Sequence, residues 1–308
     1  PLAIVIRQNT GNGEHHDPLC TADSVQHIVL DDMRAAEPSP AQPYVMPASE
    51  GNAFADVQPS RLEPVSLSGV LNGSVDSIFM QRYLSPRSPY TTLCVPTQGI
   101  GDWCSTKRTA TVDASGIRSH GVSLPDMGGA VMFSIPPTGH DIAFTSLWDN
   151  YPDSISVRVK GRATHAYLLM AGTTNPMQYD IPNGRPTAHY TDGSTDTLLL
   201  TPPYNWCPIE QDYLDDAAAF PMPQPRPYRV GLSSGIVSRH LSAALGMREA
   251  LTAGDIPGQK TAVREIKGGG GIIIDMPLNP RKRLRSITLT TLSNEVVMGI
   301  MGITLQRP

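Results

Sequence analysis

The sequence predicts an all-β protein, a jelly roll or related β-sandwich with an extended proline-rich N-terminal arm and one short helix. Its 308 residues include 29 prolines and 27 glycines, close to a fifth of the chain against about 12% in average proteins. Prolines this frequent exclude long helices, because each one removes a hydrogen bond and clashes with the preceding turn. Short apolar or alternating runs bounded by turn residues recur along the chain, and no internal repeat is visible, which disfavours a propeller.

The first 68 residues are predicted to form an extended arm or linker. They contain two strand candidates, Leu2–Ile6 and Ser24–Leu30, followed by PSPAQPYVMP, whose four prolines favour extended backbone. We expect this segment to lie over a partner surface, and plain disorder is the alternative.

Residues 69–308 are predicted to form the sandwich, with an inserted excursion at 202–227. Asp192-Gly193 marks a hairpin turn, because both positions tolerate a positive φ. The sequence SRHLSAALGMREA predicts a helix over Ser238–Ala250. The predicted strands are Ser74–Met80, Thr91–Pro96, Thr109–Asp113, Ile142–Ser146, Ser154–Val159, Ala166–Ala171, Thr187–Tyr190, Asp196–Leu200, Pro227–Leu232, Gly271–Met276, Ser286–Leu292 and Val296–Leu305.

Charge and cysteine content narrow the classes of partner. The net charge of −4 supplies no basic field for nucleic acid, so no nucleic-acid partner is expected. Without an apolar run long enough to span a bilayer, no membrane partner is expected either. The four cysteines lack zinc-ligand spacing, so no metal site and no cofactor are predicted. The first residues lack the pattern of a signal peptide, and we expect the chain to be a piece of something longer.

Several stretches resemble a known family. They are QGIGDWC at Gln98–Cys104, TSLWDNYPDSISVRVKGRATHAYLLMAGTTNPMQ at Thr145–Gln178, HYTDGSTDTLLLTPPYNWCPIEQDY at His189–Tyr213, and the tail from Arg281 to Arg307. Together they resemble the C-terminal, galactose-binding-like jelly-roll region of large secreted bacterial proteins of the six-hairpin glycosidase type, which carry a domain of unknown function. The resemblance runs from Val75 to Arg307.

The resemblance implies a role in polysaccharide degradation. The chain would be a secreted or periplasmic accessory module or subunit of a glycoside hydrolase, supporting a catalytic domain that is not in this chain, with glycan as a further ligand. Those relatives carry their catalytic carboxylates on a helical toroid for which this chain has no room, so no catalytic residue is carried over. A structural Ca²⁺ is expected by analogy only.

One loop combines groups that bind sugars. Trp148, Asp149, Asn150 and Tyr151 are consecutive, and an aromatic face packs on a sugar ring while carboxylate and amide groups bind its hydroxyls. The alternative is that Trp148 closes the end of the sandwich and its polar neighbours cap the turn.

A second loop has similar chemistry, with Trp206 and Tyr213 as sugar-binding candidates. Glu210 and Asp212 lie two residues apart, so on a strand they would share a face about 7 Å apart, near the separation in retaining glycosidases. They are the weak candidates for a catalytic pair, and a ligand-binding, domain-contacting or ordinary surface loop is the alternative.

Two further hypotheses remain open. The chain could be a stand-alone glycoside hydrolase using these loop carboxylates, or a jelly-roll structural assembly protein in which the proline-rich arm interlocks subunits. The basic run Arg281–Arg285 is interpreted as a solvated turn, or as a docking site for an acidic polysaccharide or an acidic partner.

Overall fold

The structure is a computed structural model. It describes residues 54, 57–81, 83–85, 88–91, 95–99, 102–105, 110–122, 124, 132–147, 150–174, 180–212, 225–245, 251–253, 260–262 and 266–308. The chain divides into two units, Pro1–Pro47 and Ala48–Pro308, and all described residues belong to the second unit. The strand candidates Leu2–Ile6 and Ser24–Leu30 therefore lie outside the described residues.

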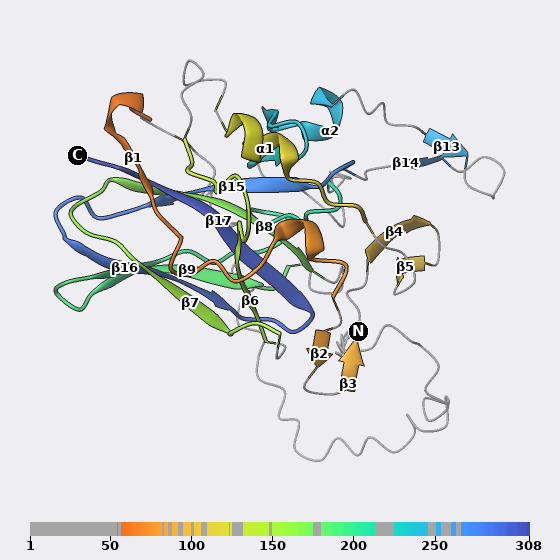
Figure 1. Cartoon of the computed structure of the whole chain (residues 1–308), viewed down its shortest axis with the longest axis horizontal. Helices are drawn as coiled ribbons and strands as arrows, with labels where there is room; N and C mark the ends of the chain where they lie inside the picture. Colours follow the sequence, from red (N-terminus) through yellow and green to blue (C-terminus); the bar gives the residue numbers. More distant parts are fainter. Residues whose placement is uncertain are drawn as a thin grey trace, which may run out of the picture. The chain divides into compact units, whose positions relative to one another are not determined.

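Two antiparallel sheets face each other (Figure 1), which confirms the all-β prediction. The larger sheet has the order β1-β17-β8-β15-β11-β12, with β6 also paired to β17. Its strands are β1 (Leu62–Val65), β6 (Ala143–Ser146), β8 (His165–Thr174), β11 (Tyr228–Gly231), β12 (Val237–Ser238), β15 (Gly270–Pro277) and β17 (Val296–Gln306).

The smaller sheet has the order β10-β9-β16-β7. Its strands are β7 (Ser154–Arg158), β9 (Gly184–Tyr190), β10 (Thr195–Thr197) and β16 (Leu284–Thr291). The hairpin predicted around Asp192-Gly193 is confirmed: β9 and β10 pair across it, and Gly193 has a φ of 86°. The Asp192 side chain accepts a hydrogen bond from the Ser194 amide at 3.0 Å, as an Asx turn does.

Eight of these strands have the connectivity of a jelly roll. Along the chain they run β6, β7, β8, β9, β10, β15, β16, β17 and form the sets β6-β17-β8-β15 and β7-β16-β9-β10. The first strand thus pairs with the last and the second with the last but one, in opposite sheets. This folded-over hairpin arrangement defines the eight-stranded jelly roll.

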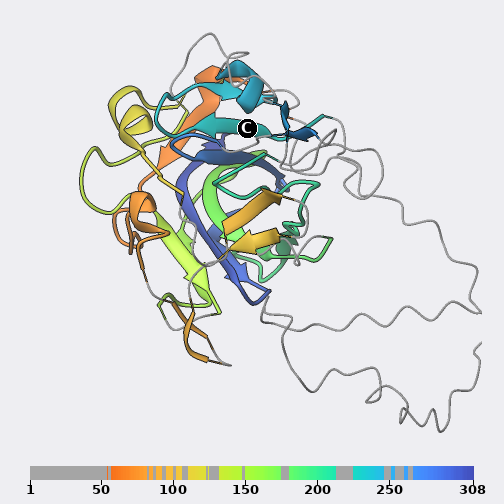
Figure 2. The same cartoon turned by 90° about the vertical axis from the view of Figure 1, so that its right-hand side faces the viewer.

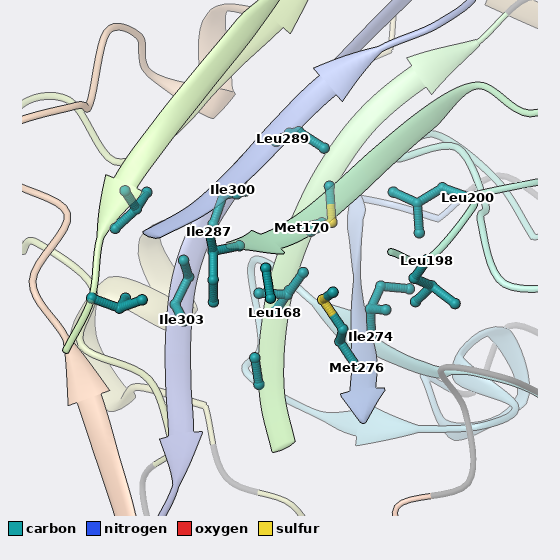
Figure 3. Close-up of a cluster of buried hydrophobic side chains, with 14 of the residues drawn as sticks. Leu168, Met170, Leu198, Leu200, Ile274, Met276, Ile287, Leu289, Ile300 and Ile303 are labelled. Carbon is teal, nitrogen blue, oxygen red and sulfur yellow. The ribbon is translucent and has the colours of Figure 1, made fainter. Parts of the chain in front are cut away.

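Aliphatic side chains fill the space between the two sheets (Figure 3). Alternate residues of β8 and β15, such as Leu168, Met170 and Ile274, meet Ile287 and Leu289 of β16 there. The period-2 alternation of each strand places these residues on one face. The jelly roll is therefore closed around an apolar core.

The larger sheet is covered on its other face as well. The alternate residues Tyr167 and Leu169 of β8 join a second buried cluster with Ile117 of helix α1 (Ser115–His120) and with Met132 and Phe133. Helix α1 lies over this sheet, on the side away from β16 and β9 (Figure 1). All eleven residues of β17 are buried, and this strand curves beside β8 (Figure 2). Among the described elements, the smaller sheet is thus the one whose outward side chains are exposed or half-buried.

Short elements complete the described chain. They are the 3-10 turns η2 (Pro59–Arg61) and η3 (Val75–Ser77), the helix α2 (Leu241–Ala244), and the paired short strands β2 (Tyr83–Ser85) with β3 (Ser88–Thr91), β4 (Val95–Gly99) with β5 (Asp102–Ser105), and β13 (Leu251–Ala253) with β14 (Lys260–Ala262).

Some predicted elements differ from the structure. Ser74–Met80 was expected to be a strand but contains η3, because the buried Asp141 carboxylate accepts the Val75 amide at 2.9 Å and holds a tight turn. Thr109–Asp113 contains only an isolated bridge between Val112 and Gly268 among its described residues. In place of one strand at Thr91–Pro96, β3 ends and β4 begins.

The helical and N-terminal predictions also change. Within the helix expected at Ser238–Ala250, the described residues contain α2 at Leu241–Ala244. Its start is wrong because Val237–Ser238 pairs with β11, and residues 246–250 lie outside the described residues. The predicted arm extended to residue 68, yet β1 pairs with β17 from Leu62↔Gln306 to Val65↔Ile303. The sandwich therefore includes the last part of that segment.

Candidate functional site

The predicted carboxylate pair lies in a segment that crosses the end of the larger sheet. The segment begins at Asn205, whose amide group donates to the Leu199 carbonyl at 2.8 Å and fixes the preceding turn. Further on, the Ile209 amide donates to the Gly172 carbonyl and the Gly270 amide donates to the Ile209 carbonyl, both at 2.7 Å. These bonds hold residues 205–212 against β8 and β15.

Arg229 of β11 holds the same segment in place through buried hydrogen bonds and an ion pair. It is 3% exposed, and its guanidinium donates to the carbonyls of Pro208 at 2.7 Å, Gly270 at 3.1 Å and Gly271 at 3.0 Å. Its Nη1 also lies 3.0 Å from Oδ1 of Asp212. A buried guanidinium with backbone acceptors and a carboxylate partner is well satisfied, so this arrangement stabilises the fold.

Glu210 lies in the same segment without such partners. It is 3% exposed, and no other described residue donates a hydrogen bond of ordinary geometry to either of its carboxylate oxygens. Burial raises its pKa to about 7, against the smaller opposing effects of its own backbone, the nearby Thr173 hydroxyl and the positive charge of Arg229. Glu210 therefore changes charge near neutral pH.

Cys207 and Trp206 are part of the same packing. The Cys207 thiol is free and buried, and burial raises its pKa to about 11, so it stays protonated at neutral pH and is a poor nucleophile. Trp206 is fully buried in the core between the sheets. The indole has no exposed face on which a sugar could stack.

The two weak catalytic candidates do not form an open carboxylate pair. Glu210 is enclosed, and Asp212 is engaged by Arg229 with only 18% of its side chain exposed. The expected strand geometry is also absent, because residues 209 and 210 form a bend. Glycoside hydrolysis needs both carboxylates in contact with the substrate. The enclosed Glu210 can change its protonation state but cannot contact a bound sugar.

Of the remaining sugar-binding candidates from the two loops, the structure describes only Asn150 and Tyr151. Trp148, Asp149 and Tyr213 lie outside the described residues. Asn150 is half-buried, and Tyr151 is 9% exposed with its ring centroid 4.9 Å from that of Phe144. Tyr151 thus packs into the core rather than presenting a ring face, and the structure does not bring these residues together with Trp206 as one described surface.

Sequence reasoning missed the outer face of the smaller sheet. Its β16 residues Ser286, Thr288 and Thr290 are half-buried and alternate with the buried Ile287 and Leu289. The run SITLTT carries this alternation and could have indicated a hydroxyl-bearing face. The predicted basic turn, Arg281–Arg285, adjoins that face because its last two residues are the first two of β16.

The geometry defines the molecule as an eight-stranded jelly roll with an apolar interior. No protein-family model matches the chain, and no curated protein is significantly similar to it. The resemblance to glycosidase-associated domains therefore stays a prediction. Within the described ranges, no three His, Cys, Asp or Glu side chains gather in a way that could hold a metal ion, and no helix is long and apolar enough to cross a membrane.

Proposed function

We propose that this chain is a structural assembly protein, a jelly-roll subunit of a closed shell or lattice. The observation that carries the proposal is the strand order, β6-β17-β8-β15 facing β7-β16-β9-β10. Eight-stranded jelly rolls of this kind build viral capsids and also occur as lectin domains and cupins.

The interior and the buried aromatics favour assembly among these uses. Aliphatic side chains fill the space between the sheets, where a cupin holds its reaction site. Trp206 and Tyr151, two of the aromatic candidates for sugar stacking, are buried. The first 47 residues form a separate unit with four prolines in a ten-residue run, a composition suited to an extended segment that links neighbouring subunits.

Assembly is tested on the purified full chain by sedimentation velocity and negative-stain electron microscopy over a wide range of protein concentration. We expect shells or lattices above a threshold concentration. A matched variant replaces residues 1–47 with a glycine-serine linker of equal length, and we expect it to keep its circular dichroism spectrum and lose assembly. A folded full chain that sediments as a monomer at every concentration would contradict the proposal.

A second candidate function is carbohydrate binding in support of a catalytic domain on another polypeptide, in a secreted or periplasmic setting. The jelly-roll topology favours it to the extent that lectin domains share it. Affinity electrophoresis through gels containing plant polysaccharides tests this candidate, with Trp148→Ala as the diagnostic variant. Unchanged mobility in every gel would reject it. Stand-alone hydrolysis has weaker support, given the enclosed Glu210.

A further inference from the structure

The outer face of the four-stranded sheet is an ordered array of short polar side chains. Strand register aligns them in three rows across β7, β16, β9 and β10. The rows are Arg158-Ser286-His189-Thr195, then Ser156-Thr288-Thr187-Thr197, then Ser154-Thr290-Arg185. All of these residues are exposed or half-buried. Eight of the eleven carry a hydroxyl and two carry a guanidinium, and the alternate residues of the same strands face the core.

The middle row carries hydroxyls on all four strands. The Thr288 hydroxyl donates to that of Ser156 at 3.1 Å, and the hydroxyls of Thr187 and Thr197 lie 3.4 Å apart. Neighbouring strands are about 4.8 Å apart and successive rows about 7 Å apart. The face is therefore a shallow grid of groups that both donate and accept hydrogen bonds.

Positive charge flanks this grid at one end. Arg158 lies in the first row, and a β-bulge between Leu284 and Ser286 adds Arg285, which is exposed while Leu284 is buried. A bulge can re-aim a side chain in this way. The Val159 amide donates to the Arg285 carbonyl at 3.1 Å, so β7 and the bulge are neighbours here.

The turn that precedes β16 extends the positive end. Arg281 and Arg283 are exposed, whereas Lys282 lies 3.6 Å from the Asp192 carboxylate. Within the described part of the chain, no ion pair involves the arginines of this end or Arg185 at the other. Asp153 and Asp192 flank the face just beyond strand ends, and none of the three rows contains a carboxylate.

We propose that this face, with the turn at Arg281–Arg285, binds an acidic polysaccharide. Guanidinium groups form paired hydrogen bonds with carboxylate or sulfate groups, and the rows of serine and threonine match the hydroxyls of the sugar rings. The charge of the face is complementary to such a polymer although the whole chain has a net charge of −4. This proposal does not depend on the assembly function.

The side chains favour a polysaccharide over nucleic acid. Single-stranded nucleic acid is held by aromatic side chains on which bases stack, and none of the eleven residues of the three rows is Phe, Tyr or Trp. Recognition through charge and hydroxyl groups alone suits a polymer whose monomers carry both.

The test is affinity electrophoresis of the full chain through native gels containing polygalacturonate, heparin or neutral dextran. We expect at least one acidic polymer to retard the protein, dextran not to, and added salt to reduce the effect. The double variant Arg158→Ser/Arg285→Ser should bind roughly tenfold more weakly, as expected for the loss of about 1.4 kcal/mol in charge-assisted contacts. Thr187→Val/Thr288→Val should also bind more weakly, while the β-branched replacements keep the strand.

The matched control is Arg61→Ser/Arg162→Ser, which removes the same charge from two exposed arginines outside the rows. It should leave binding within about twofold, since screening weakens distant surface charges. Lack of retardation by either acidic polymer overturns the proposal, as does an equal loss in the control variant. Equal retardation by poly(U) that depends on Arg158 and Arg285 would show a general polyanion site instead. Sedimentation of the same variants separates any of these outcomes from a failure of assembly.

Discussion

The Nε atom of Arg118 in helix α1 lies 3.0 Å from Oδ2 of Asp141, a carboxylate with no exposed surface just before β6. A second guanidinium nitrogen approaches the same oxygen at 2.5 Å, and the third pairs with Asp76 at 2.8 Å. Asp141 also accepts the Val75 amide. One buried carboxylate thus joins helix α1, the turn η3 and the start of the jelly roll.

Asp141→Asn should therefore destabilise the protein by about 3 kcal/mol, because it leaves a largely buried guanidinium without its main partner. Urea unfolding followed by circular dichroism measures the change. Asp76→Asn is the control: this side chain is 33% exposed, so its loss should cost less than about 1 kcal/mol. Equal losses of unfolding free energy in the two variants would show that the buried Arg118–Asp141 pair stabilises the protein no more than the exposed pair does.

Glu210 should make stability depend on pH. Its folded pKa, raised by burial to about 7, lies above the ordinary value of 4.5, so its contribution to stability is fully present below pH 4.5 and is lost as the pH rises through 7. The expected loss is about 3 kcal/mol for a group this deeply buried. Glu210→Gln should remove this dependence and raise the melting temperature at pH 8 more than at pH 4.5.

Glu63→Gln provides the control for that experiment. Its carboxylate is exposed, and a hydrogen bond from Arg307 lowers its pKa, so its effect should run in the opposite direction with pH and be small. If the melting temperature of Glu210→Gln follows that of the natural sequence from pH 4.5 to 8, Glu210 does not titrate in this range.

Gly172 lets β8 and β17 approach closely. A Cβ added there would lie 2.3 Å from the Val297 carbonyl oxygen and 2.6 Å from the Met298 Cα, both backbone atoms that cannot turn aside. Gly172→Ala should cost roughly 3 kcal/mol, as overpacking of a tight core does. Gly69→Ala, where no atom lies within 4 Å of the added Cβ, should be nearly neutral in the same denaturant titration.

Trp206 should act through packing rather than through sugar binding. Trp206→Ala should destabilise the protein by about 4 kcal/mol because it leaves a large cavity, while Trp206→Phe should cost about 1.5 kcal/mol or less. Calorimetry measures both, with glycan affinity recorded below the melting temperature. A stable Trp206→Ala variant that selectively loses glycan affinity would contradict this packing role.

The strands of the jelly roll were predictable because their signal is local. Ser154–Val159, Ala166–Ala171, Gly271–Met276 and Val296–Leu305 each overlap the strand that forms there, since turn residues bound runs of β-branched or apolar side chains. The continuous burial of β17 also shows in its sequence, VVMGIMGITLQ, whose first eight residues include no polar side chain.

Features that depend on contacts between residues far apart in the sequence could not be predicted from local patterns. The run at Ser74–Met80 looks like a strand until the Asp141 carboxylate, 66 positions from Val75, holds its backbone in a turn. Trp206 and Glu210 sit among polar and proline residues that suggest a surface loop, and only the hydrogen bonds to β8 and β15 bury them. The three polar rows depend on register between strands far apart in sequence.

The position of β17 in the chain sets the order in which this molecule can be completed during synthesis. Its three partners, β1, β6 and β8, all leave the ribosome before it does. Until β17 emerges, these strands lack the neighbour that joins them, and unpaired edges invite association with other chains. The nascent chain is therefore expected to close its larger sheet only after β17 has been synthesised, and protection by chaperones should matter most before that point.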